Sequence, residues 1–275
     1  MALLRFNFQS DCLGNNTEIS VILPDKAPGV TPESFYGSGK KYKVLWLLHG
    51  TFGDHTDWLR KSNVELYACE RGLAVVMFSG LNSNYVNWDS FATGYRPWDF
   101  LFDELMPLVY GWLPISDRRE DNFIAGLSMG GNGAMQYAMG HPEKFAGAAS
   151  LSNAPTDLRE QQAAGYDGKA EGDAAKLFNR RVRNLIDNFG GIENYVNSPL
   201  NIWDRLTELN GTGKLPKLFF CCGTKDTLIW DKYVNFKAYA KQIGLDAAFW
   251  EAEGYTHEWR FWDLSLQRAL DYFGL

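Results

Sequence analysis

The stretch that most constrains the fold of this chain is residues 121–135, DNFIAGLSMGGNGAM. An apolar run leads into a G-x-S-x-G pattern centred on Ser128, and a segment with helical character continues to Gly140. This succession predicts a strand, a sharp turn and a helix, with the serine at the apex of the turn. Small neighbours let the strand and the helix pack closely around a strained backbone. We therefore expect Ser128 to be a nucleophile. The alternative is a glycine-rich structural turn.

Apolar strand patterns alternate with helical patterns along most of the chain. Strands are expected at residues 3–9, 17–23, 44–48, 73–78, 122–127, 147–151, 217–222 and 247–252. Helices are expected at residues 58–71, 99–112 with a kink at Pro107, 172–189, 199–208, 230–243 and 258–273, and after the serine turn. The alternation predicts an α/β fold with a mostly parallel sheet and helices on both faces. The first two strands read as an antiparallel hairpin at a sheet edge, and 24–41 and 79–98 read as loops.

The 275 residues are expected to form a single α/β domain, 1–275. The segment 153–216 contains helical patterns but no strand-like run. A stretch of that length without a strand is best explained as a helical, cap-like insertion over the top of the sheet.

Composition excludes several classes of protein. Apolar residues make up 45% and charged residues 22%, as in ordinary soluble proteins, and the net charge of −6 argues against nucleic-acid and anionic-membrane partners. The basic group at residues 180–183 reads as a solvated helix face. No apolar run approaches the ~20 residues that span a bilayer, and the apolar start is too short for a signal peptide. The four cysteines lack metal-ligand spacing, so we expect free thiols, no metal and a cytoplasmic protein.

A serine nucleophile needs a base, and the base needs a carboxylate that orients it. The strand expected at 217–222 leads into a loop with Asp226, and the strand at 247–252 leads into a loop with His257. Ligands bind beyond the carboxyl ends of parallel strands, so both side chains should lie near Ser128. The chain order Ser, Asp, His fits this fold class.

Other histidines and carboxylates compete for these roles. The alternative bases are His49, His55 and His141, which we expect to be structural. The alternative carboxylates are Asp231 and Glu258, which fall in helix starts rather than at a strand end.

A developing oxyanion needs hydrogen-bond donors. One is the N–H of Met129, which follows the nucleophile at a helix N-terminus. The second should come from the loop after the strand at 44–48, where the N–H of Thr51 or of Phe52 is the candidate. We further expect Phe52, Trp88 and Trp230 to bind substrate, with the aromatic loop 85–98 as a wall of the site.

Three stretches resemble a known family. Residues 47–58 (LLHGTFGDHTDW), 120–131 (EDNFIAGLSMGG) and 142–145 (PEKF) are similar to the esterase D group of α/β-hydrolases, especially to bacterial tributyrin esterase-like acyl esterases. The resemblance covers nearly the whole chain and implies an α/β-hydrolase fold without a cofactor. It also implies a triad of Ser128, Asp226 and His257 and, because the donor in this family follows the His-Gly pair directly, oxyanion donors at Thr51 and Met129. It suggests a homo-oligomer.

The resulting hypothesis is a serine carboxylesterase for short-chain acyl esters that works through an acyl-enzyme. An alternative is a thioesterase that resembles S-formylglutathione hydrolase, although those enzymes usually carry His where this chain has Leu127. Removal of acetyl or feruloyl groups from plant-polysaccharide fragments is a further alternative, as is acyl transfer to a sugar hydroxyl. A non-catalytic scaffold would need none of the three triad groups.

Overall fold

The computed structural model describes the backbone of residues 1–163 and 173–275 and the side chains of residues 1–160 and 180–275. Its centre is an eight-stranded sheet in the order β1-β2-β4-β3-β5-β6-β7-β8. The strands are β1 (Ala2–Ser10), β2 (Asn15–Leu23), β3 (Val44–Leu48), β4 (Ala74–Phe78), β5 (Asn122–Leu127), β6 (Gly147–Leu151), β7 (Lys217–Gly223) and β8 (Ala247–Ala252). The β1–β2 hairpin and the β2–β4 pair are antiparallel, and the other pairs are parallel. The predicted mostly parallel sheet with an antiparallel hairpin at its edge is confirmed.

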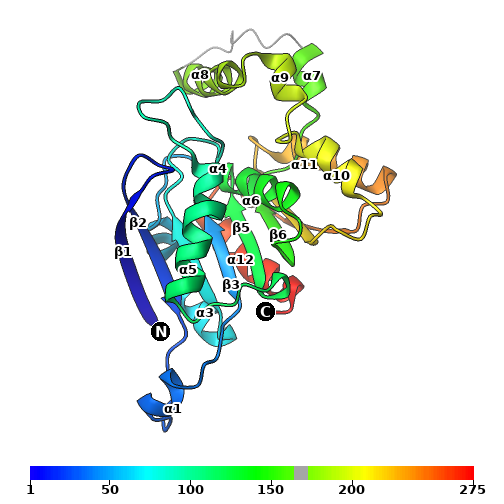
Figure 1. Cartoon of the computed structure of the whole chain (residues 1–275). Helices are drawn as coiled ribbons and strands as arrows, with labels where there is room; N and C mark the ends of the chain where they lie inside the picture. Colours follow the sequence, from blue (N-terminus) through cyan, green and yellow to red (C-terminus); the bar gives the residue numbers. More distant parts are fainter. Residues whose placement is uncertain (164–172) are drawn as a thin grey trace.

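Helices cover both faces of this sheet (Figure 1). The strand β3 shows why, because its five apolar residues are all buried and point alternately to two cores. The core on one face includes Trp46 and residues of α5 (Met106–Trp112), α6 (Met129–Gly140), α10 (Ile202–Leu209) and α11 (Trp230–Gln242). The core on the other face includes Leu45 and residues of α2 (Asp57–Lys61), α3 (Val64–Arg71) and α12 (Trp259–Phe273).

Two predicted helices are divided in the structure. The helix expected at 58–71 is α2 followed by α3, because Ser62 is extended and its hydroxyl donates to the Trp58 carbonyl at 2.5 Å. The helix expected at 99–112 consists of α4 (Pro97–Asp99), a π-helical turn η1 (Phe100–Leu105) and α5. Pro107 has no N–H to donate to the preceding turn, and the wide turn comes directly before it.

Two short helices lie before β3 and β5, outside the elements expected from the sequence. The helix α1 (Pro32–Tyr36) begins where the Thr31 side chain accepts from the N–H of Ser34 and proline occupies the first helical position. The single turn η2 (Arg119–Asp121) precedes β5. Both are too short to show a hydrophobic period.

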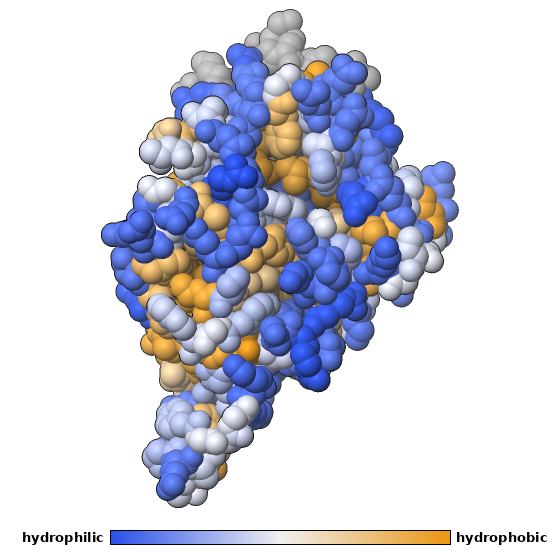
Figure 2. All heavy atoms as spheres, in the orientation of Figure 1, coloured by the Kyte–Doolittle hydropathy of each residue, from blue (hydrophilic) through white to orange (hydrophobic). Residues whose placement is uncertain are grey.

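The segment between β6 and β7 carries α7 (Leu158–Ala163), α8 (Asp173–Asn188), α9 (Ile192–Val196) and α10. Figure 1 shows α7, α8 and α9 together at the top, beyond the sheet. In the same orientation, Figure 2 shows apolar residues in a depression just below this group. The described part of 153–216 contains no strand, and residues 164–172 of the predicted insertion lie outside the described residues. Within the described ranges, no helix is long and apolar enough to cross a membrane.

Candidate active site

Ser128 occupies the turn between β5 and α6 with φ 52° and ψ −117°, a backbone conformation that residues other than glycine rarely adopt. Close packing around the turn maintains it. A Cβ on Gly126 would lie 2.3 Å from the Gly130 carbonyl oxygen, and a Cβ on Gly130 would lie 2.5 Å from the His49 carbonyl oxygen. Glycine is therefore required at both positions of the G-x-S-x-G pattern.

Ser128, His257 and Asp226 form one hydrogen-bonded chain. His257 Nδ1 lies 2.7 Å from Asp226 Oδ2, and His257 Nε2 lies 3.0 Å from Ser128 Oγ. Because an ionised carboxylate only accepts, Nδ1 carries the proton and Nε2 accepts from the serine hydroxyl. Asp226 is fully buried and also accepts from the N–H of Leu228 at 3.2 Å. The structure thus brings together the three side chains expected from the sequence, in the arrangement that activates a serine.

The competing groups lie elsewhere. Glu258 accepts from the N–H and hydroxyl of Thr256, and Asp231 is exposed on the first turn of α11. Among the histidines, His55 contacts Ser20 and His141 contacts Glu143. None of these four side chains contacts Ser128 in the described part of the chain.

The loop after β3 offers one of its two candidate N–H groups. The N–H of Phe52 donates to Asn82 Oδ1 at 2.8 Å, so it is already engaged. Within the described residues, the N–H groups of Thr51 and of Met129 donate to no protein acceptor. Met129 is the first residue of α6, where the helix leaves its N–H groups free and places a partial positive charge.

His49 forms hydrogen bonds that hold the loop after β3 in place. Its Nδ1 donates to the Gly50 carbonyl at 2.6 Å, and its Nε2 accepts from the N–H of Gly80 at 2.8 Å. Tyr85 donates its hydroxyl to the His49 carbonyl at 2.9 Å. Burial lowers the pKa of His49, which keeps the ring neutral and able to make both bonds. The expected framework role of His49 agrees with these contacts.

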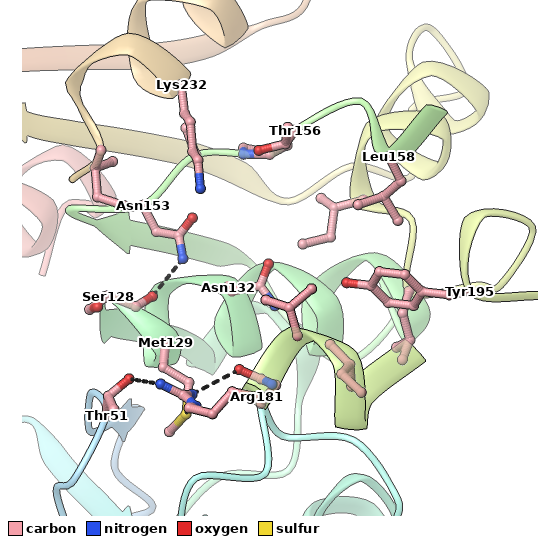
Figure 3. A pocket seen from close by; sticks show the side chains of 18 residues that line it. Thr51, Ser128, Met129, Asn132, Asn153, Thr156, Leu158, Arg181, Tyr195 and Lys232 are labelled. Atoms are coloured by element: carbon pink, nitrogen blue, oxygen red, sulfur yellow. Dashed lines mark hydrogen bonds between the residues drawn. The ribbon is translucent and has the colours of Figure 1, made fainter. Parts of the chain in front are cut away.

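Two cavities open beside Ser128, with volumes of about 200 Å³ and about 570 Å³. The smaller is lined on one side by four residues of the segment between β6 and β7, namely Leu158, Val182, Leu185 and Tyr195. Figure 3 shows Leu158 and Tyr195 facing Asn132 across it. The larger cavity includes Phe52, Leu228, Trp259, Trp262 and His257. Among the described residues, no group of three or more His, Cys, Asp or Glu side chains is placed to hold a metal ion.

Comparison with known proteins assigns the family. The Esterase family model, described as "Putative esterase", matches residues 10–273. The acetyl esterase of Caldicellulosiruptor saccharolyticus is 31% identical over 282 residues, which cover 99% of this chain and 98% of the relative. The chain belongs to the Esterase family. It is a carboxylic ester hydrolase.

Solved structures place the fold. FphF, a fluorophosphonate-binding serine hydrolase of Staphylococcus aureus, is similar with a TM-score of 0.78 and 28% identity, over 99% of this chain and 98% of that chain. The S-formylglutathione hydrolase FrmB of the same organism is similar with a TM-score of 0.74 and 28% identity, over the same shares of the two chains. The predicted α/β-hydrolase fold is confirmed.

Of the three aromatic residues expected to bind substrate, one lines a cavity beside Ser128. Phe52 lines the larger cavity and is 72% exposed. The structure does not bring Trp88 or Trp230 to the site in this way, because neither ring lines either cavity beside Ser128. Trp88 turns back into its own loop, where Nε1 donates to the Ser83 carbonyl, and Trp230 stacks on Tyr233 with ring centroids 6.0 Å apart.

The sequence analysis did not include two residues that contact Ser128 and His257. Asn153 follows β6 and donates its amide to the Ser128 carbonyl at 2.7 Å. Trp262, on α12, packs edge-on against the His257 ring at 5.0 Å and donates to Ser152 Oγ at 2.9 Å. The position of Asn153, two residues after the end of a parallel strand, was a usable signal.

It also missed two cations. Arg181 is not on a solvated face. It donates to Thr51 Oγ1 at 2.9 Å and to Asn84 Oδ1 at 3.2 Å (Figure 3). Lys232, on α11, lines both cavities, as Arg181 does. Burial lowers the pKa of both side chains. The signal for Arg181 was its spacing of one helical turn from the apolar Leu185, which put both on the inner face of α8.

Proposed function

We propose that this esterase hydrolyses short-chain acyl esters through Ser128, His257 and Asp226. Ser128 Oγ attacks the ester carbonyl while His257 Nε2 takes its proton. The same proton then goes to the departing alcohol, which leaves an acyl-enzyme. Water, activated by His257, releases the acid. Asp226 keeps the imidazole in the required tautomer and stabilises its cation. The observation that carries the proposal is the unbroken hydrogen-bonded chain from Asp226 to Ser128.

The N–H groups of Thr51 and Met129 are proposed to hold the oxyanion that forms during each attack. Their freedom from other acceptors in the described residues supports this role. One such donor typically contributes about 3 kcal/mol to transition-state stabilisation. Preference for Thr51 over Phe52 rests on the engagement of the Phe52 N–H by Asn82.

A short acyl group is supported by the smaller cavity, whose volume of about 200 Å³ lies between Ser128 and the insertion. The similar protein from Caldicellulosiruptor saccharolyticus is named an acetyl esterase, which is consistent with a small acyl group. The finer likeness to tributyrin esterase-like enzymes is part of this proposal.

A thioesterase resembling S-formylglutathione hydrolase is the second candidate, because FrmB shares 28% of its sequence with this chain across nearly its full length. Leu127, where such enzymes usually carry His, speaks against it. The feruloyl alternative loses support from the position of Trp88, which leaves the aromatic loop without the expected ring at the site.

The test is a series of p-nitrophenyl esters from acetate to decanoate, with methyl ferulate and S-formylglutathione alongside. We expect kcat/KM to be highest among the short acyl chains. A maximum at the long chains would contradict the short-acyl proposal, and a maximum for S-formylglutathione would establish the thioesterase. Ser128→Ala should fold normally and reduce turnover to near background.

We further propose a cytoplasmic location. It is supported by the four cysteines, which are all free thiols, and two of them, Cys221 and Cys222, are buried. Fractionation of the source cells with immunodetection tests this. Recovery of the protein mainly outside the cytoplasm would contradict it.

A further inference from the structure

The cavities beside Ser128 carry an excess of positive charge. Arg181 and Lys232 line both of them. Among its described lining residues, the smaller cavity has no carboxylate at all. In the larger cavity, Asp57 is the one described carboxylate, and its Oδ1 is 2.9 Å from Lys61 Nζ. The protein as a whole has a net charge of −6, so this positive region is local to the site.

Neither cation has an acidic partner in the described part of the chain. The guanidinium of Arg181 is held by neutral acceptors, and its Nε is buried without a partner. Lys232 makes no hydrogen bond or ion pair within the described residues. Figure 3 shows its ammonium group pointing into the cavity above Asn153, with Arg181 on the opposite side of Ser128 and Met129. A partly desolvated cation without a partner is costly, which favours an anion that arrives with the ligand.

A structural role explains the position of only one of the two cations. Arg181 links α8 of the insertion to the loop of Thr51, and this link alone could account for its position. Lys232 makes no such contact between elements in the described part of the chain. It is nevertheless partly buried, and burial lowers its pKa. Two positive charges that converge on one nucleophile raise the local concentration of negatively charged substrates.

We propose that the preferred substrates of this esterase carry a carboxylate, on the acyl or on the alcohol part, and that Arg181 and Lys232 bind it beside Ser128. This inference rests on the proposed function and specifies the substrate class of the same site. Charge-assisted hydrogen bonds to the carboxylate would give both cations the anionic partner that the described residues do not provide.

Two matched pairs of esters test the preference. In the first pair, para-acetoxybenzoate and para-acetoxybenzamide differ only in the charge on the alcohol part. In the second pair, the mono-p-nitrophenyl ester of glutaric acid and p-nitrophenyl pentanoate differ in the charge on the acyl part. Each kcat/KM is divided by the rate constant for hydrolysis of the same ester by hydroxide, which corrects for differences in intrinsic reactivity. We expect the charged ester to exceed its neutral partner by about tenfold or more in at least one pair, the size of one to two charge-assisted hydrogen bonds.

Variants assign the preference to the two side chains. Lys232→Gln and Arg181→Gln should each lower the charged-to-neutral ratio about tenfold, and Lys232→Arg should retain most of it. The matched controls are Arg180→Gln on α8 and Lys241→Gln on α11, exposed cations of the same helices that line neither cavity. Their ratios should equal that of the wild type.

Several outcomes would overturn the inference. A charged-to-neutral ratio of kcat/KM near one in both pairs would show that the wild type has no such preference. Equal losses of kcat/KM on charged and neutral esters in both glutamine variants would show that the two cations have a structural role only. If no ester is hydrolysed, the proposed function fails separately. In that case calorimetric titration of Ser128→Ala with para-hydroxybenzoate, para-hydroxybenzamide and glutarate still decides the inference. Binding of an anion that Lys232→Gln abolishes would support it, and absence of anion binding would contradict it.

Discussion

At the residue scale, the geometry of Ser128 depends on groups that hold its backbone rather than its hydroxyl. The serine N–H donates to the Leu151 carbonyl at 2.7 Å, and its carbonyl accepts from Asn153 at 2.7 Å. These two bonds fix the peptide groups on either side of a strained φ of 52°. The hydroxyl therefore lies 3.0 Å from His257 Nε2 without a bound substrate, as the proposed mechanism requires.

Asp226 provides the first prediction at this scale. In Asp226→Asn, the amide can donate to Nδ1 of His257 and stabilise the wrong tautomer, so kcat for p-nitrophenyl acetate should fall on the order of 10⁴-fold. The isosteric side chain should leave the thermal unfolding midpoint nearly unchanged. Asp231→Asn, which changes an exposed carboxylate near the same loop, is the control and should retain full activity. A loss of less than tenfold in Asp226→Asn would mean that another carboxylate orients the base.

His49 provides a prediction for pH. Because burial lowers the pKa of folded His49 below its ordinary value of about 6.5, the unfolded chain takes up this proton first as the pH falls. The contribution of His49 to stability is therefore fully present above about pH 6.5 and is lost as the pH falls from there towards the folded pKa, at up to about 1.4 kcal/mol per pH unit.

Urea unfolding at pH 7 and pH 5.5 measures this contribution. The free energy of unfolding of His49→Gln should fall less between the two values than that of the wild type, because glutamine does not titrate. His55, His141 and His257 are common to both proteins and cancel in the comparison. Parallel losses in the two proteins would show that His49 does not contribute to the acid sensitivity.

At the scale of elements, the serine turn is a three-way contact among β3, β5 and α6. A Cβ on Gly130 would lie 2.5 Å from the His49 carbonyl oxygen and 2.7 Å from that of Leu48. Both are backbone atoms, which cannot move aside as a flexible side chain can. The helix α6 can approach the strands only because this position has no side chain.

Gly130→Ala should therefore destabilise the protein by about 1–3 kcal/mol, the usual cost of overpacking, and should also lower kcat. Gly111→Ala is the matched control, since Gly111 lies in α5 with nothing within 4 Å of an added Cβ. That substitution should stabilise the helix by about 0.5–1 kcal/mol. Denaturant midpoints compare the two variants. Equal midpoints would indicate that the turn relaxes around the added methyl group.

The elements differ in how much of them the sequence could predict. Strands such as β3 and β7 are buried on both faces, so their apolar runs are continuous and their ends sharp. The break at Ser62 between α2 and α3 was not predictable from spacing, because the apolar residues of both helices keep a helical period. The segment 153–216 was predicted to be helical. Which residues of α8 face the cavity beside Ser128 depends on how this helix packs, and helical spacing alone does not determine that.

At the scale of the whole molecule, the site collects residues from loops that follow four parallel strands. Ser128 follows β5, Asp226 follows β7, His257 follows β8, and Thr51 follows β3. Parallel strands end at one edge of the sheet, so the sequence could predict this set from strand ends alone. Arg181 and Lys232 could not be predicted in this way, because their helices reach the site by folding over that edge.

The central claim is that Ser128 is the nucleophile activated by His257, and covalent labelling of the folded protein tests it most directly. Intact mass and peptide mapping after treatment with a fluorophosphonate should show a single adduct on Ser128. The adduct should be absent in Ser128→Ala and form far more slowly in His257→Gln, whereas labelling of His141→Gln should match the wild type. No adduct, or an adduct on another residue of the folded wild-type protein, would contradict the account.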